Sequence, residues 1–274
     1  MAKALSEVLE FAAQTDPGMV RPNNEDSVVV NPALGLAILA DGMGGSSSGE
    51  VASGMATTLL ATDLRRALTR LSPGDVVGTE PRVFGVLRER IAVANGSIFQ
   101  AAESQPQHAG MGTTLVMALF YDNRVAAAHI GDSRLYRLRA GNLAQLTRDH
   151  SYLQLQIDAG MITPEEARRS KQKNIVTRAL GVESQVEPEI HEHPVQPGDI
   201  YILCSDGLYD MVEETDLALT LQAPGANLQS AAQRLVQMAN DNGGRDNVSV
   251  ILVKVVKGFA APKSWWRRFI AWLK

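Results

Sequence analysis

Four aspartates of this chain share a sequence context that is suited to metal chemistry. A predicted strand precedes each of them, and a glycine or asparagine lies directly beside it or within three residues. They are Asp41, Asp132, Asp206 and Asp246. A further acidic pair, Glu25-Asp26, opens a predicted strand. Carboxylates that converge from strand ends form a cage of hard oxygen ligands, which suits Mg²⁺ or Mn²⁺ rather than zinc.

Each aspartate could instead be an ordinary turn residue, because Asp-Gly is common where a strand ends. The recurrence of the pattern in one chain is harder to explain in that way. Like-charged carboxylates repel, and gathering them is costly unless a cation neutralises their charge. A neighbouring glycine also lets a backbone carbonyl approach a cation. The pattern therefore favours an acidic two-metal site, and the five histidines, which lack ligand-like spacing, argue against zinc.

The elements that must position these residues are predicted from the apolar periodicity. The predicted strands are residues 6–15, 26–31, 34–40, 113–121, 124–130, 133–139, 143–146, 186–191, 200–205 and 248–256. The predicted helices are residues 50–71, 83–103, 213–221 and 227–241, and residues 150–180 show helical patches without a clear strand. Strands arriving in hairpins, with helices grouped between them, indicate an α+β fold of antiparallel sheets covered by helices.

The composition is that of a globular protein. The 274 residues are 45% hydrophobic and 20% charged, which argues against disorder. No apolar run is long enough to span a bilayer, and none follows the first three residues, so we expect no signal peptide. The single cysteine, Cys204, is compatible with a reducing cytosol, and without a neighbouring His or Lys it is expected to be a buried core residue.

Charge is distributed unevenly along the chain. The net charge is -4, yet Lys263, Arg267, Arg268 and Lys274 stand at the C-terminus with no acid among them. The remainder of the chain is therefore strongly acidic, which disfavours a nuclease or another nucleic-acid-binding protein. Neither a Gly-x-Gly-x-x-Gly segment after a strand nor a Walker A segment occurs, so the common nucleotide-binding motifs are absent from the sequence.

Six segments, in this order, resemble the signature of the PPM (type 2C) metal-dependent protein serine/threonine phosphatases, in the style of their bacterial branch. They are Arg21 with Asn24-Glu25-Asp26, Asp41-Gly42-Met43-Gly44-Gly45, Gly110-Met111-Gly112-Thr113-Thr114, Gly131-Asp132-Ser133-Arg134, Ser205-Asp206-Gly207-Leu208, and Asp246-Asn247. The resemblance covers about residues 7–256. It implies a four-layer α-β-β-α sandwich of two antiparallel sheets flanked by helices, with a catalytic domain over residues 1–258 and a basic amphipathic tail over residues 259–274.

The resemblance also implies a ligand set for two Mn²⁺ or Mg²⁺ ions. Asp41 would bridge the two ions, and the carbonyl of Gly42 would be a further ligand. Asp206 and Asp246 would complete the pair. Asp132 would hold a third, weakly bound ion beside Asp206.

Three further residues receive roles by the same resemblance. Glu25 and Asp26 would act on the ions mainly through waters, and Arg21 would bind the phosphate. Two metal ions can lower the pKa of a shared water, so that hydroxide attacks phosphorus in line while the guanidinium holds phosphoryl oxygens. The implied activity is hydrolysis of phosphoserine and phosphothreonine on proteins, opposing a bacterial Ser/Thr kinase.

An alternative with the same fold is a catalytically weak regulatory or binding module. The complete set of four aspartates argues against it, because a degenerate member would be expected to lose metal ligands. The sequence departs from many eukaryotic relatives at Met43, where a histidine could protonate the leaving oxygen, so the general acid stays open. Among the histidines, His129 is expected in the sheet or core, and His150 in a capping or structural role.

Two segments outside the signature carry separate predictions. Residues 160–180 correspond in position to the flap of bacterial relatives, and their basic residues would either attract phosphopeptides or be an ordinary solvated surface. Residues 264–273 contain all three tryptophans and predict a short amphipathic helix. It would dock on a membrane surface or, equally, on the phosphatase body or a second copy. The expected location is cytoplasmic, peripheral at the inner face of the membrane.

Overall fold

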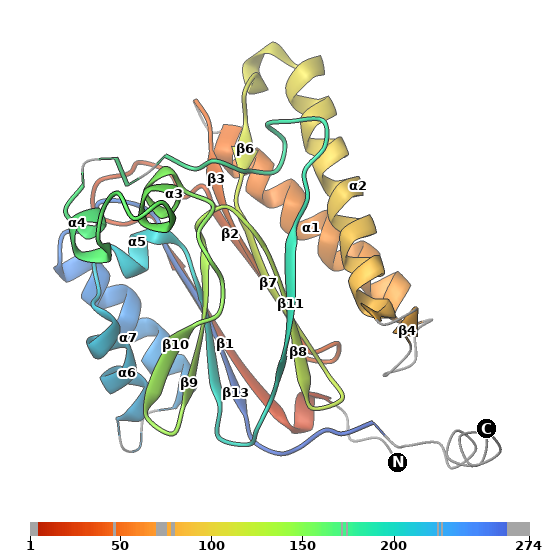
Figure 1. Cartoon of the computed structure of the whole chain (residues 1–274), viewed down its shortest axis with the longest axis vertical. Helices are drawn as coiled ribbons and strands as arrows, with labels where there is room; N and C mark the ends of the chain where they lie inside the picture. The colour runs from red at the N-terminus through yellow and green to blue at the C-terminus, as the bar shows by residue number, and fades with distance from the viewer. Residues whose placement is uncertain are drawn as a thin grey trace.

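Two antiparallel β-sheets face each other between two helical layers in the computed structural model (Figure 1). The structure describes residues 5–45, 48–69, 76–77, 80–170, 172–173, 175–223, 225 and 227–261. The first sheet has the strand order β1 (Leu9–Asp16), β13 (Val248–Val255), β12 (Ile200–Cys204), β9 (Arg134–Arg139) and β10 (Asn142–Gln145). The two ends of the chain thus contribute neighbouring strands, since β1 pairs with β13 along its whole length.

The second sheet contains the strands that carry Asp26 and Asp41. Its order is β11 (Glu189–Pro194), β8 (Arg124–Ile130), β7 (Leu115–Tyr121), β3 (Leu36–Met43) and β2 (Asp26–Asn31), with β6 (Gly112–Thr113) paired to the end of β3. A separate two-stranded pair joins β4 (Val76–Val77) to β5 (Glu80–Pro81).

Helices cover the outer face of each sheet. The long helices α1 (Ser48–Leu68) and α2 (Arg82–Ser104) lie on the second sheet. The helices α5 (Asp206–Tyr209), α6 (Glu214–Gln222) and α7 (Leu228–Asp241) lie on the first. Two short helices, α3 (Tyr152–Asp158) and α4 (Pro164–Arg168), stand at one end of the sandwich, and short 3₁₀ turns occur at Leu5–Glu7 and Pro106–His108.

Three apolar layers hold these four structural layers together. Between the sheets, Phe120 and Tyr201 meet edge to face with their ring centroids 5.1 Å apart. Leu60 of α1 and Ile91 of α2 are fully buried against the second sheet, and Leu235 of α7 is fully buried against the first. The predicted four-layer sandwich is confirmed.

Some predicted element boundaries are confirmed and others are wrong. The strands at 26–31 and 124–130 occur as predicted, and the turn between β7 and β8 has positive φ at both Asp122 and Asn123, as a type I′ hairpin turn requires. The strand predicted to end before Asp41 instead runs on to Met43, because β6 supplies backbone partners for its last residues. The strand predicted at 186–191 occurs three residues later.

The last described residues lie against the β7–β8 turn. Phe259 is buried in the layer between the sheets, and its N–H donates to Asn123 Oδ1 at 2.6 Å. The N–H of Ala261 donates to Asp122 Oδ1 at 2.7 Å. The amphipathic helix predicted over residues 264–273 lies outside the described residues. Within the described part of the chain, no helix combines the length and the apolar character that crossing a membrane requires.

Candidate metal centre

Asp41 and Asp26 come together because their strands are paired in register. The residues are direct cross-strand partners in the β2–β3 ladder. The backbone of Asp41 is also held from the side of β6: its N–H donates to Thr114 Oγ1 at 3.0 Å, and its carbonyl accepts from Thr113 Oγ1 and from the Thr114 N–H, both at 2.8 Å. The two threonines thereby fix the position from which the Asp41 carboxylate leaves the sheet.

Gly42 lies where only hydrogen fits. A Cβ at this position would overlap the carbonyl oxygen of Gly49 at the start of α1 and would lie 2.6 Å from the carbonyl oxygen of Glu25. The N–H of Gly42 donates to that same Glu25 carbonyl at 3.1 Å. The strand and the helix therefore approach closely enough to keep the Gly42 backbone beside the carboxylates.

The other three aspartates come from loops of both sheets. Asp132 follows β8 of the second sheet, whereas Asp206 follows β12 of the first sheet and opens α5. Asp246 precedes β13, so the predicted context of a strand followed by the aspartate is wrong for this residue. All three lie at the same end of the sandwich as Asp41, since each contributes to the electrostatic environment of the Asp41 carboxylate.

Ionisation is opposed at four carboxylates of the cluster. Burial, together with the charges of Asp26 and Asp206, raises the pKa of Asp41 well above its ordinary value. Burial and the charges of Asp132 and Asp246 do the same to the pKa of Asp206. Burial, with a smaller contribution from neighbouring acids, raises the pKa of Asp26 to about 6 and that of Asp132 to about 7. Carboxylates that oppose one another in this way favour the presence of a cation.

The donor set fits hard divalent cations. Asp26 Oδ2 accepts from Ser205 Oγ at 2.8 Å, but its buried Oδ1 has no hydrogen-bond partner. Such an orphaned acceptor is costly unless a ligand satisfies it. With several carboxylates and the backbone carbonyl of the buried Gly42 beside them, the residues suit Mg²⁺ or Mn²⁺.

Arg21 stands at the rim of this cluster. Its Nη2 lies 2.7 Å from Asp246 Oδ2, and about half of its side chain is exposed. Glu25 is half-buried, and burial raises the pKa of its carboxyl although Arg21 lowers it. The structure thus brings together every residue that the sequence analysis assigned to the site.

Both the sequence and the fold of the chain are similar to those of known proteins. The family model described as protein phosphatase 2C matches residues 22–252. The chain belongs to the protein phosphatase 2C family. The matched range contains all five aspartates of the cluster and both sheets apart from β1 and the end of β13.

Bacterial members of the family are similar over most of this chain. The serine/threonine protein phosphatase PstP of Mycobacterium tuberculosis is 42% identical over 249 residues, which are 91% of this chain but only 45% of PstP. The chain therefore spans about half the length of that relative. The serine/threonine phosphatase Stp of Listeria monocytogenes is 40% identical over 88% of this chain and 94% of its own length.

Solved structures of this family share the fold. A crystal structure of the Mycobacterium tuberculosis phosphatase PstP superimposes with a TM-score of 0.81 at 41% identity, covering 91% of this chain and 99% of that one. The catalytic domain of PstP in complex with two manganese ions gives a TM-score of 0.79, with the same identity and coverage.

Several residues that organise this family member's site had no predicted role. Asn247 Oδ1 accepts from the Glu25 N–H at 2.8 Å, while its amide group donates to the carbonyl of Pro17 at 3.0 Å. Tyr209 donates its hydroxyl proton to the Asp132 carbonyl at 3.1 Å, and the Arg134 guanidinium lies 3.7 Å from the centre of the Tyr209 ring. Asn247 and Arg134 lie in segments of the family signature, and that position was the sequence signal by which they could have been identified.

The predicted flap is built around α3 and α4. Its base is closed by a β-bridge between Ser151 and Val176. A cavity of about 410 Å³ lies between this segment and α5, and its lining includes Asp132, Asp206 and Arg168. Lys171, one of the basic residues of the predicted flap, lies outside the described residues.

The remaining predictions concern residues away from the cluster. Cys204 is fully buried, as predicted, and burial raises the pKa of its thiol to about 12, which leaves it unreactive. His129 is buried in β8, as predicted. His150 caps no helix but lies at the entry to the flap, where it contacts backbone and a carboxylate.

Proposed function

We propose that this chain is a metal-dependent protein phosphatase that hydrolyses phosphoserine and phosphothreonine on proteins. The observation that carries the proposal is the convergence of Asp132, Asp206 and Asp246 on Asp41, whose ionisation all three oppose, beside an unpartnered buried oxygen of Asp26. The similar bacterial proteins PstP and Stp are named serine/threonine phosphatases. PstP binds two manganese ions in its crystal structure.

The cluster residues divide the task of holding cations. Asp41, with the carbonyl of Gly42, would hold a pair of Mn²⁺ or Mg²⁺ ions from the β3 side, and Asp206 and Asp246 would hold it from the first sheet. Two bound cations supply positive charge for a phosphate dianion and lower the pKa of a water molecule. Asp132 would share a third, weakly held ion with Asp206, whose ionisation it opposes.

Glu25 and Asp26 support the pair from behind β2. The half-buried Glu25 lies against Gly49, and Asp26 is fixed by the Ser205 hydroxyl. Both carboxyls also feel the charge of Asp246, so they lie close enough to the cluster to act on cations through water.

Arg21 would bind the phosphoryl group. In the structure its guanidinium is paired with Asp246, and both side chains are only partly buried. When Asp246 instead holds a cation, the guanidinium becomes available for phosphoryl oxygens, which its planar fork can bind through two parallel hydrogen bonds. The general acid stays unassigned, because Met43 cannot donate a proton.

A direct assay tests the function. We expect Mn²⁺-dependent release of phosphate from a phosphothreonine peptide, no turnover after removal of divalent cations by a chelator, and no cleavage of nucleic-acid substrates under the same conditions. Peptide binding without measurable turnover would instead favour the catalytically weak binding module.

Partners and location follow from this activity as further parts of the proposal. A bacterial Ser/Thr kinase would supply the phosphorylated proteins, and the reaction would take place in the cytoplasm. Residues 264–273 would bring the enzyme to the inner face of the membrane, since their tryptophans and basic residues suit an anionic lipid surface. Co-sedimentation with anionic liposomes, comparing the full chain with a chain ending at Ala261, tests this part. If both chains stay in the supernatant at low salt, the tail packs elsewhere.

A further inference from the structure

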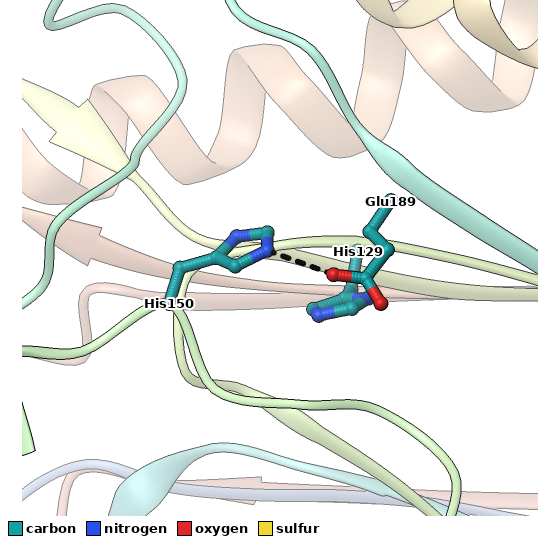
Figure 2. A group of neighbouring side chains, drawn as sticks. All are labelled: His129, His150 and Glu189. Carbon is teal, nitrogen blue, oxygen red and sulfur yellow. Dashed lines mark hydrogen bonds and ion pairs between the residues drawn. The ribbon is translucent and has the colours of Figure 1, made fainter. Parts of the chain in front are cut away.

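A second cluster of titratable side chains lies outside the aspartate site. His129 comes from β8, Glu189 from the adjacent strand β11, and His150 from the chain entering the flap (Figure 2). Their ligand-type atoms lie within 4.8 Å of one another, and the two imidazole rings are stacked with centroids 4.7 Å apart. By residue type alone, this cluster could hold a transition metal.

The hydrogen bonds of His150 exclude that role for its ring in this position. The N–H of Gly131 donates to His150 Nδ1 at 3.2 Å, so the lone pair of this nitrogen is occupied. In the neutral ring, Nε2 must then carry the proton. This nitrogen lies 3.3 Å from Glu189 Oε2, which accepts its hydrogen bond (Figure 2). Neither nitrogen of the ring retains a lone pair for a cation. The tautomer of His150 is therefore determined by its two partners.

The surroundings keep His150 neutral and Glu189 ionised. Burial and the neighbouring His129 lower the pKa of His150, which keeps the ring neutral. Burial opposes ionisation of Glu189, but hydrogen bonds from His191 and His150 outweigh it and lower the pKa of this carboxyl. His129 is held in turn, since its Nε2 donates to the Arg148 carbonyl at 2.8 Å.

His150 contacts both polar groups of the residue that precedes Asp132. Besides accepting from the Gly131 N–H, it donates its own backbone N–H to the Gly131 carbonyl at 2.9 Å. Gly131 has φ of +100°, and a Cβ there would lie 2.7 Å from Thr114 Cγ2, so this turn has a narrowly defined conformation. On the other side, the Asp132 carbonyl accepts from the Tyr209 hydroxyl.

We propose that His150 is a positioning residue for Asp132, and that Glu189 supports it by holding the Nε2–H tautomer. The imidazole fixes the Gly131-Asp132 turn, so that the Asp132 carboxylate stays where it can share a cation with Asp206. This inference rests on the proposed function, in which Asp132 is a metal ligand. It predicts that the His150 ring controls the affinity of the weak, Asp132-dependent cation and leaves the tight pair unchanged.

Two nearly isosteric variants separate the two nitrogens of the ring. In His150→Asn, the amide oxygen replaces Nδ1 and can still accept from the Gly131 N–H. In His150→Gln, the amide group replaces Nε2 and can still donate to Glu189, but the acceptor for Gly131 is lost. The positioning role requires the first variant to resemble wild type and the second to differ from it.

Calorimetric titration of the full-length chain with Mn²⁺ provides the readout, with Asp132→Asn marking the binding event that depends on Asp132. We expect His150→Gln to weaken that event by about 10- to 100-fold, the usual effect of losing a partner of a metal ligand, and His150→Asn to change it less than about threefold. Amide hydrogen exchange of Gly131 in the metal-free protein should accelerate only in His150→Gln.

The outcomes separate this inference from the function on which it rests. If wild type shows an Asp132-dependent event that His150→Gln leaves unchanged, or that both variants weaken equally, the positioning role is wrong while the proposed function stands. If Asp132→Asn binds Mn²⁺ as wild type does, the third-ion assignment and the inference are both overturned. Should His150→Gln fail to fold, Glu189→Ala replaces it, because removal of the acceptor for Nε2–H should weaken the same event; no change would contradict the inference.

Discussion

The surroundings of single carboxylates in this site oppose their ionised form. Asp206 is half-buried, and desolvation together with the charges of Asp132 and Asp246 raises its pKa. Removing such a charge should relieve repulsion in the metal-free protein while removing a ligand from the metal-bound one. A substitution that removes the charge should therefore lower the activity of the metal-bound protein but raise the stability of the metal-free protein.

Asp206→Asn should reduce Mn²⁺-dependent phosphatase activity by at least about 100-fold. This is more than the usual effect of losing a residue that hydrogen-bonds to a metal ligand. The chelator-treated variant should melt at or above the temperature of chelator-treated wild type, because one repelling charge is gone. Steady-state kinetics and thermal melting measure the two effects. Asp216→Asn, an exposed aspartate in the first turn of α6, is the matched control and should change neither.

Arg21→Ala should lower kcat/KM for a phosphopeptide by about 10- to 100-fold, the value of a charge-assisted hydrogen-bond pair. Mn²⁺ affinity should not fall, since the substitution frees Asp246 from its ion pair. Arg21→Lys should restore little activity, because an ammonium lacks the two-pronged geometry. Kinetics with calorimetric metal titration test this, and the neighbouring exposed Arg245→Ala is the control. Unchanged kinetics in Arg21→Ala would exclude the phosphate-binding role.

At the scale of elements, the site depends on the close approach of β3 and α1. The strand continues through Asp41 and Gly42 because β6 pairs with its end, and α1 begins directly beside it. The Glu25 carbonyl is shared by this junction, since it accepts from the Gly42 N–H and from Ser53 Oγ of α1. A side chain at position 42 would separate these three segments.

Gly42→Ala should destabilise the fold by about 1–3 kcal/mol, the usual cost of overpacking, and should weaken Mn²⁺ binding at the same time. The added methyl group meets backbone oxygens, which cannot turn aside as a flexible side chain can. Gly54→Ala is the control: it lies in α1 with open space around its position, and it should stabilise the helix by up to about 1 kcal/mol. Urea denaturation of both variants, with and without Mn²⁺, measures the contrast.

For the whole molecule, the candidate metal centre joins the two sheets. The second sheet contributes Asp26, Asp41 and Asp132, and the loops of the first sheet contribute Asp206 and Asp246. Cations that bind only this folded arrangement stabilise it by mass action. Without cations, the same residues link stability to pH.

The chelator-treated protein should lose stability as the pH rises. Asp132 titrates near pH 7 in the folded state, against an ordinary value of 3.8, so the folded state binds the proton more tightly than the unfolded chain. Its contribution is therefore complete below about pH 4 and is lost as the pH rises toward 7, at up to about 1.4 kcal/mol per pH unit. Comparison with Asp132→Asn isolates this residue from the buried histidines, whose lowered pKa values act in the opposite direction.

Urea denaturation at pH 5 and at pH 7.5 checks this linkage. Wild type without cations should lose more stability than Asp132→Asn over that interval, and saturating Mn²⁺ should remove the difference at pH 7.5. Parallel changes in the two chelator-treated proteins would show that Asp132 does not titrate in this range.

The sequence by itself determined the class of fold and predicted the ligand chemistry. The ordered acidic segments predicted a hard-cation site, and apolar periodicity located strands such as residues 26–31 and 124–130, because both signals are local. The two residues left between the predicted strands 113–121 and 124–130 likewise indicated a hairpin turn at Asp122-Asn123, and the structure shows its positive φ values. These features need only neighbouring residues to define them.

Only the tertiary structure decided how the segments meet. The extension of β3 past Asp41 depends on β6, about 70 residues away, and the hydrogen bond from Ser205 to Asp26 joins residues 179 positions apart. The tautomer of His150 depends on Gly131, which follows β8, and on Glu189, which opens β11. Such contacts arise where strand pairing and packing bring together segments that are far apart in the chain, and no local pattern encodes the hydrogen-bond partners that result.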